Sequence, residues 1–104
     1  MADSPWVGDA CSLVDAFRAG DRTPLEELDA TLAAIEASDL GAFSFVDVEG
    51  ARDRARRADP SLPFGGVPVG IKELEQVEGW PDTGASLVFK DQSETRRIDR
   101  MRAD

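Results

Sequence analysis

The sequence predicts an α/β fold, and three observations support that class. Apolar residues recur at helical spacing around Leu28, which is typical of an amphipathic helix. Thr23-Pro24-Leu25-Glu26 precedes this segment as a capping box with proline at the first helical position. Val67, Val69 and Ile71 alternate along a short run that follows glycines, and this alternation favours a buried strand.

The first element along the chain is a helix that is expected to begin after Asp9, whose carboxylate can cap it. Leu13, Val14 and Phe17 then fall on one face of the helix. Gly20 closes it, because glycine tolerates the left-handed conformation that ends many helices. We therefore expect a short helix with one buried side.

The second helix begins at the capping box and ends at Asp39-Leu40-Gly41. Its apolar residues recur every three or four positions, so they form a stripe along one face. The stripe consists of Leu25, Leu28, Leu32 and Ile35.

A short strand is expected next, over Ala42–Asp47, because Phe43 and Phe45 alternate with Ser44. A third helix follows, from about Glu49 to Ala58, with alanines on one side. Its four arginines are better explained by a solvated face paired with nearby acids than by an anion site, since the chain is strongly acidic. These arginines are Arg52, Arg54, Arg56 and Arg57.

Lys72 closes the predicted strand Val67–Glu73, which follows a turn-rich connector over Pro60–Gly66. A lysine at the end of a buried strand is partly desolvated, and burial disfavours the ammonium form. A neutral lysine can take a proton from a hydroxyl, so Lys72 is a candidate general base. The alternative is a structural lysine that extends its charged end into water.

The last part of the chain carries weaker signals. Leu87-Val88-Phe89 is expected to form a short extended or helical run, and Glu94–Ala103 a final helix with Ile98 and Met101 facing inward. No glycine follows this helix as a cap, which favours a cut through a larger fold.

Composition excludes several classes of partner. The formal net charge is −9 and the pI is about 4.4, which argues against nucleic acid or an anionic membrane as partners. No apolar run approaches the roughly 20 residues of a membrane span, and no signal peptide is visible. One cysteine, Cys11, cannot form an internal disulfide, so a cytoplasmic location is expected. Histidine is absent, which excludes a histidine-dependent triad or metal site within these residues.

Several segments in order resemble the start of the amidase signature family. Gly66–Lys72 is similar to its catalytic-lysine strand, and Glu78–Ser86 is similar to the sequence that follows. Ser12–Gly20 and Thr23–Leu28 resemble the two opening helices, and Ala42–Asp47 resembles the first strand. The resemblance therefore runs from about residue 10 to the last residue.

The resemblance implies a mixed β-sheet flanked by helices, of which residues 1–104 are an N-terminal fragment without the nucleophile half. It implies an amidase-type hydrolase that cleaves a carboxamide C–N bond with a serine nucleophile, a serine in a cis peptide and a lysine. Lys72 matches that lysine, and no cofactor or metal is expected. The substrate of the full-length enzyme would be a small-molecule amide, and this chain alone is expected to be inactive. Self-association through unpaired sheet edges is also expected.

Three points stay open within the resemblance. Glu73 stands where the family most often has aspartate. Ser86 is expected to stabilise a loop, the other reading being a nucleophile paired with Lys72, and Trp80 is expected to pack over a strand end, the other reading being a binding anchor. The alternative function is a non-catalytic fragment or subunit that binds another chain through its helices and sheet edge.

Overall fold

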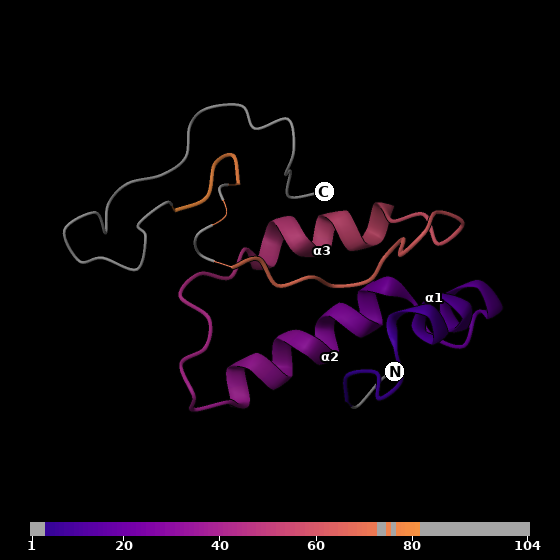
Figure 1. Cartoon of the computed structure of the whole chain (residues 1–104), viewed down its shortest axis with the longest axis horizontal. Helices are drawn as coiled ribbons and strands as arrows, with labels where there is room; N and C mark the ends of the chain where they lie inside the picture. Colours follow the sequence, from indigo (N-terminus) through magenta and orange to yellow (C-terminus); the bar gives the residue numbers. More distant parts are fainter. Residues whose placement is uncertain (1–3, 73–74, 76, 82–104) are drawn as a thin grey trace. The chain divides into compact units, whose positions relative to one another are not determined.

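Three helices make up the regular structure of the residues that the computed structural model describes, which are 4–72, 75 and 77–81. They are α1 (Ala10–Ala19), α2 (Pro24–Ala37) and α3 (Val48–Arg57) (Figure 1). The chain divides into two compact units, residues 1–68 and 69–104. The first unit holds the three helices, and the second holds Lys72.

Helix α1 begins and ends where the sequence predicts. The Asp9 carboxylate accepts the backbone N–H of Ser12 at 2.7 Å, which satisfies one of the free donors at the start of the helix. Gly20 adopts a left-handed conformation with φ +79° and ends the helix. The buried side chains of α1 include the three that were predicted, and Ala16 joins them: Leu13, Val14, Ala16 and Phe17.

Helix α2 starts at the predicted cap, where the Thr23 hydroxyl accepts the backbone N–H of Glu26 at 3.1 Å. It ends at Ala37, three residues before Leu40, with Ser38 already extended. Of the predicted apolar stripe only Leu28 is buried, and the other three residues are half-buried. Helix α2 thus carries the predicted stripe, but three of its four residues stay partly exposed among the described residues.

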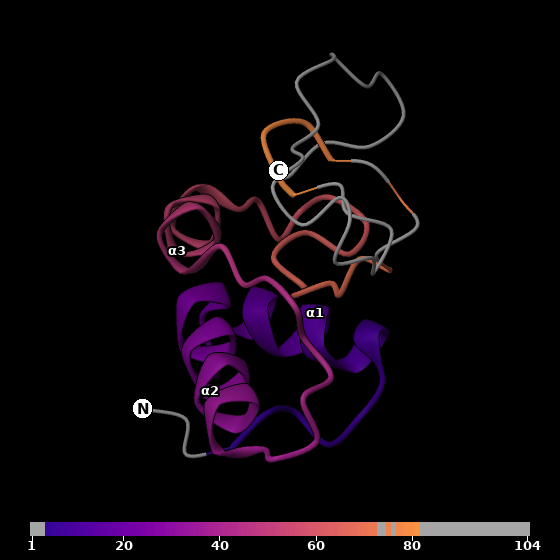
Figure 2. The same cartoon turned by 90° about the vertical axis from the view of Figure 1, so that its left-hand side faces the viewer.

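Helix α3 lies alongside α2 in both views (Figures 1 and 2). The Asp47 carboxylate caps it by accepting the N–H of Gly50 at 3.1 Å, so the helix begins one residue earlier than predicted. None of its residues is buried. Ala51 and Ala55 of the predicted small face are half-buried, and as alanines they contribute little apolar area.

The predicted α/β class, with its mixed sheet flanked by helices, is wrong for residues 4–72, 75 and 77–81, none of which lies in a strand. Ala42–Asp47 is irregular, with the Phe43 side chain 50% exposed. Val67–Lys72 is irregular as well, and Val69 is 74% exposed. Apolar residues alternate in the sequence of both segments, but neither segment forms a strand.

The physical reason is that alternation describes only the two faces of a possible strand. A strand also needs a neighbour that accepts and donates the hydrogen bonds of a ladder. No ladder of paired strands is present among the described residues. Because the described residues form no sheet, they offer no unpaired sheet edge for the predicted self-association.

Other predictions fall outside the described residues. They concern Glu73, the loop that contains Ser86, the Leu87-Val88-Phe89 run and the helix over Glu94–Ala103.

Candidate functional site

Lys72 lies exposed in an irregular segment of the second unit. Its backbone carbonyl accepts the N–H of Glu75 at 2.9 Å. The prediction that Lys72 is desolvated at the end of a buried strand is therefore wrong for this structure.

The connector that precedes this segment is built from successive turns in the first unit. The N–H of Leu62 donates to the carbonyl of Asp59, that of Gly65 to Leu62, and that of Val67 to Phe64, at 3.0–3.1 Å. The predicted turn-rich connector is thus confirmed. Short repeated turns of this kind fix the path of the backbone without a helix or strand.

The carboxylate of Asp59 closes the start of the connector. It accepts both the backbone N–H of Ser61 at 3.0 Å and the Ser61 hydroxyl at 2.7 Å. The hydroxyl first, and then the N–H, lower the pKa of Asp59 below its usual range, because both favour the charged carboxylate.

Two contacts dock the connector on the helices. The Arg18 guanidinium donates from Nε to the carbonyl of Pro60 at 2.7 Å. At the other end, Gly66 adopts φ +92° and lies so close to Pro24 that a Cβ at this glycine would be 2.6 Å from the proline Cγ. A Cβ at Gly65 would lie 1.9 Å from the carbonyl oxygen of Asp59. Both glycines are therefore required by close approach, and Gly66 also by its backbone conformation.

Phe64, between these two contacts, adopts φ +59°, which is uncommon for a bulky residue. Its side chain is 59% exposed. The connector thus holds a strained residue in place with an aromatic ring largely in solvent.

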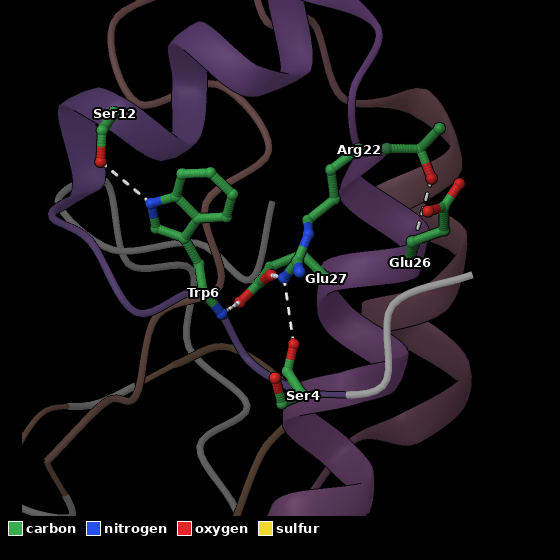
Figure 3. A network of polar contacts seen from close by, with 7 residues as sticks. Ser4, Trp6, Ser12, Arg22, Glu26 and Glu27 are labelled. Atoms are coloured by element: carbon green, nitrogen blue, oxygen red, sulfur yellow. Dashed lines mark hydrogen bonds and ion pairs between the residues drawn. The ribbon is translucent and has the colours of Figure 1, made fainter.

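A polar network, which the sequence analysis did not anticipate, ties the N-terminal segment to α2 (Figure 3). Glu27 is buried and forms an ion pair with Arg22, and its other carboxylate oxygen accepts the backbone N–H of Trp6 at 3.0 Å. The Arg22 guanidinium also donates to the carbonyl of Ser4 at 3.1 Å and lies 5.2 Å from the centre of the Trp6 ring. The Trp6 indole N–H donates to the Ser12 hydroxyl at 2.9 Å.

A shallow hollow of about 210 Å³ adjoins this network in the first unit. Trp6, Leu13, Glu27 and Val67 are among the residues that line it. Because Glu27 is already engaged by Arg22 and by the backbone of Trp6, the network serves mainly to hold the chain together. A tryptophan with an indole N–H to satisfy was the one sequence signal that could have indicated it.

Three of the four arginines of α3 form ion pairs with nearby acids, as predicted. Arg52 contacts Asp29 on α2, Arg54 lies 3.6 Å from Asp47, and Arg57 lies 2.8 Å from Asp53. These pairs are partly or largely exposed, so the prediction of a solvated, acid-paired face is confirmed.

Trp80 is half-buried in the second unit, and its backbone N–H donates to the carbonyl of Val77 at 3.0 Å. Cys11 is exposed, as a free thiol in the first turn of α1.

Two classes of site are missing from the part of the chain that the structure covers. No group of three or more carboxylates or thiols lies there in a position to hold a metal ion. None of its helices is long and apolar enough to cross a membrane.

Comparison with known proteins gives one consistent result. The chain is 36% identical to GatA, a component of the glutamyl-tRNA(Gln) amidotransferase, of Acidobacterium capsulatum, in a match covering 74% of this chain and 18% of the relative. The GatA protein of a Jannaschia species is also 36% identical, covering 85% of this chain and 20% of the relative. That of Nitrobacter winogradskyi is 40% identical over 66% of this chain and 16% of the relative.

The chain thus spans about a fifth of the length of the curated relatives it matches. No family model matches the sequence, and no solved structure matches it either.

Proposed function

Because this chain belongs to the amidase signature family, as do the GatA proteins it matches, we propose that it supplies the lysine-bearing N-terminal part of an enzyme that cleaves a carboxamide C–N bond. The observation that carries the proposal is the Gly66–Lys72 motif within a chain 36% identical to those proteins. We assign residues 1–104 to the N-terminal portion of the domain and its nucleophile to the remainder.

Lys72 is the catalytic residue of this part. A neutral amine at Lys72 takes a proton through the serine of the cis peptide, and this activates the serine nucleophile that attacks the amide carbon. The C–N bond then breaks, its nitrogen leaves as ammonia with the proton that Lys72 took up, and water takes the acyl group from the serine. In an amidotransferase the released nitrogen passes to another acceptor. The mechanism uses no metal or cofactor.

The exposure of Lys72 sets a condition on this mechanism. An exposed ammonium is well solvated, and only apolar surroundings or a nearby cation make it neutral near pH 7. The rest of the enzyme must therefore supply those surroundings around Lys72. The accessible side chain of the lysine is compatible with such a contact.

The substrate in this proposal is a small-molecule amide. The relatives are named for an amidotransferase acting on a glutamyl-tRNA, yet a net charge of −9 makes this segment a poor surface for nucleic acid. We therefore place any tRNA contact outside this chain. The proposed location is the cytoplasm, in keeping with a single cysteine that cannot form an internal disulfide.

A chimera tests the proposal. This chain replaces the aligned N-terminal segment of the Acidobacterium capsulatum GatA, and ammonia release from a panel of primary carboxamides is measured. Lys72→Ala is expected to abolish release, whereas Lys90→Ala, at the only other lysine of the sequence, is expected to leave it within about twofold. Removal of a general base commonly lowers activity by about 10²–10⁴-fold.

The alternative, a non-catalytic chain that binds another chain through its helices, makes the opposite prediction. In that case the chimera would keep its activity after Lys72→Ala, provided that the variant folds as judged by circular dichroism. That result would contradict the proposed function.

A further inference from the structure

We propose that Gly66 is a positioning residue for Lys72, because it lets the connector seat against the helices and so fixes the point from which the lysine-bearing segment departs. The inference rests on the proposed function, in which Lys72 is catalytic. It concerns a residue that contacts neither substrate nor reacting atoms.

The first observation is that Gly66 lies close to residues of both α1 and α2. A Cβ at Gly66 would lie 2.6 Å from Cγ and 2.9 Å from Cβ of Pro24, and 3.3 Å from a ring carbon of Phe17. Pro24 opens α2 and Phe17 is buried in α1, so neither can move without disturbing its helix. A methyl group at Gly66 must therefore push the connector away.

The second observation is that the connector is held at its other end too. Arg18 donates to the carbonyl of Pro60 at 2.7 Å. The hydrogen bonds of the turns between Pro60 and Val67 restrict the path of the backbone over this segment. The path from Pro60 to Pro68 is thus determined by the first unit. A shift at Gly66 has to be passed on toward Pro68.

The third observation is the short distance along the chain. Lys72 is four residues after Pro68, so it can reach at most about 14 Å from that anchor. A misplacement of about 1 Å at a catalytic group can lower a rate by about 10²-fold. A displaced anchor is therefore expected to reduce turnover even though the active-site residues are intact.

Gly41 provides a matched control. It also has a left-handed backbone, with φ +63°, but a Cβ there would meet nothing within 4 Å. Gly41→Ala and Gly66→Ala both place a Cβ on a backbone with positive φ, and only Gly66→Ala adds the collision with Pro24 and Phe17.

The experiment measures kcat and KM for ammonia release by the chimera. Gly66→Ala is expected to lower kcat roughly 10- to 100-fold with KM changed by less than about threefold, and Gly41→Ala to change either by less than about twofold. Pro24→Gly removes the two nearest atoms, so adding it to Gly66→Ala should recover part of kcat. If Gly66→Ala acted only through a general loss of stability, both alanine variants would have a lower melting temperature. Adding Pro24→Gly would then not restore kcat.

A second measurement needs no activity. In the 104-residue chain, hydrogen exchange at the amides of Gly65 and Val67, which donate within the connector, should speed up at least about tenfold in Gly66→Ala and not in Gly41→Ala. Equal exchange in the two variants, or equal kcat while Lys72→Ala is inactive, would overturn the inference. An active Lys72→Ala chimera would instead overturn the proposed function on which it rests.

Discussion

The carboxylate of Glu27 and the guanidinium of Arg22 form an ion pair in which the side chains are only 5% and 16% exposed. The same carboxylate accepts the backbone N–H of Trp6, so one buried group joins α2 to the N-terminal segment. A buried charge is costly unless it has partners. The Glu27 carboxylate has two, the Arg22 guanidinium as an ion pair and the Trp6 N–H as a hydrogen-bond donor.

Glu27→Ala is therefore expected to be among the most damaging single substitutions in the first unit. It leaves the Arg22 charge and the Trp6 N–H without their acceptor, and we expect the free energy of unfolding to fall by about 3 kcal/mol. Urea denaturation followed by circular dichroism measures it.

Glu36→Ala, at an exposed position on the same helix, is the matched control and should change the free energy of unfolding by less than about 0.5 kcal/mol. The double variant Arg22→Met, Glu27→Leu removes both charges and should cost less than Glu27→Ala alone. Equal effects for Glu27→Ala and Glu36→Ala would show that the ion pair does not hold the segment.

The cap of α1 predicts a pH dependence. The backbone N–H of Ser12, and then its hydroxyl, hold the pKa of Asp9 below the usual value for an aspartate. A carboxyl whose pKa is lowered by folding adds stability above its ordinary pKa of about 3.9, and that stability is lost as the pH falls through the lower folded value.

Carbon-13 NMR titration of the Asp9 carboxyl should show a pKa below that ordinary value. Ser12→Ala removes the hydroxyl but keeps the backbone N–H, so the pKa should rise part of the way back. A pKa of Asp9 at or above the ordinary aspartate value would contradict the cap.

Helix α3 is expected to be the least protected of the three helices in hydrogen exchange. It buries no residue, and the ion pair between Arg52 and Asp29 is its salt bridge to α2. High salt screens partly exposed charges, so about 1 M NaCl should speed exchange in α3 more than in α1.

Arg52→Ala and Arg57→Ala separate the cause. The first removes the pair between helices and the second removes a pair within α3, to Asp53. Arg52→Ala should increase the exchange of α3 roughly two- to fivefold, in keeping with about 0.5–1 kcal/mol for an exposed pair. If Arg57→Ala had the larger effect, docking by Arg52 would be the wrong explanation.

Lys72→Arg tests the chemical role of the lysine in the chimera. Guanidinium stays protonated at any working pH, so it cannot accept a proton, and ammonia release should fall nearly as far as in Lys72→Ala. Release should not return when the pH is raised. An arginine variant with most of its activity would mean that Lys72 acts through its charge.

Local signals in the sequence predicted the helices well. The caps at Asp9 and Thr23 and the stop at Gly20 depend on neighbours within a few residues, which any reader of the sequence can see. The paired arginines of α3 followed from composition in the same way.

The strands and the environment of Lys72 could not be predicted on that basis. Whether Val67–Ile71 pairs as a strand, or whether Lys72 is buried, depends on what lies beside it in space. The network of Glu27, Arg22 and Trp6 was missed for a similar reason, because its members are brought together only by the packing of the N-terminal segment on α2.

The hydrogen bond from residue 6 to Glu27 is donated by the main chain. Every amino acid except proline carries that donor, so the tie between the N-terminal segment and α2 does not depend on which side chain occupies position 6. A homologous sequence could lose the tryptophan and keep the tie, provided that it keeps the acid at the position of Glu27. Proline at position 6 would sever the tie while leaving the acid untouched, so a comparison restricted to matching side chains would overlook both outcomes.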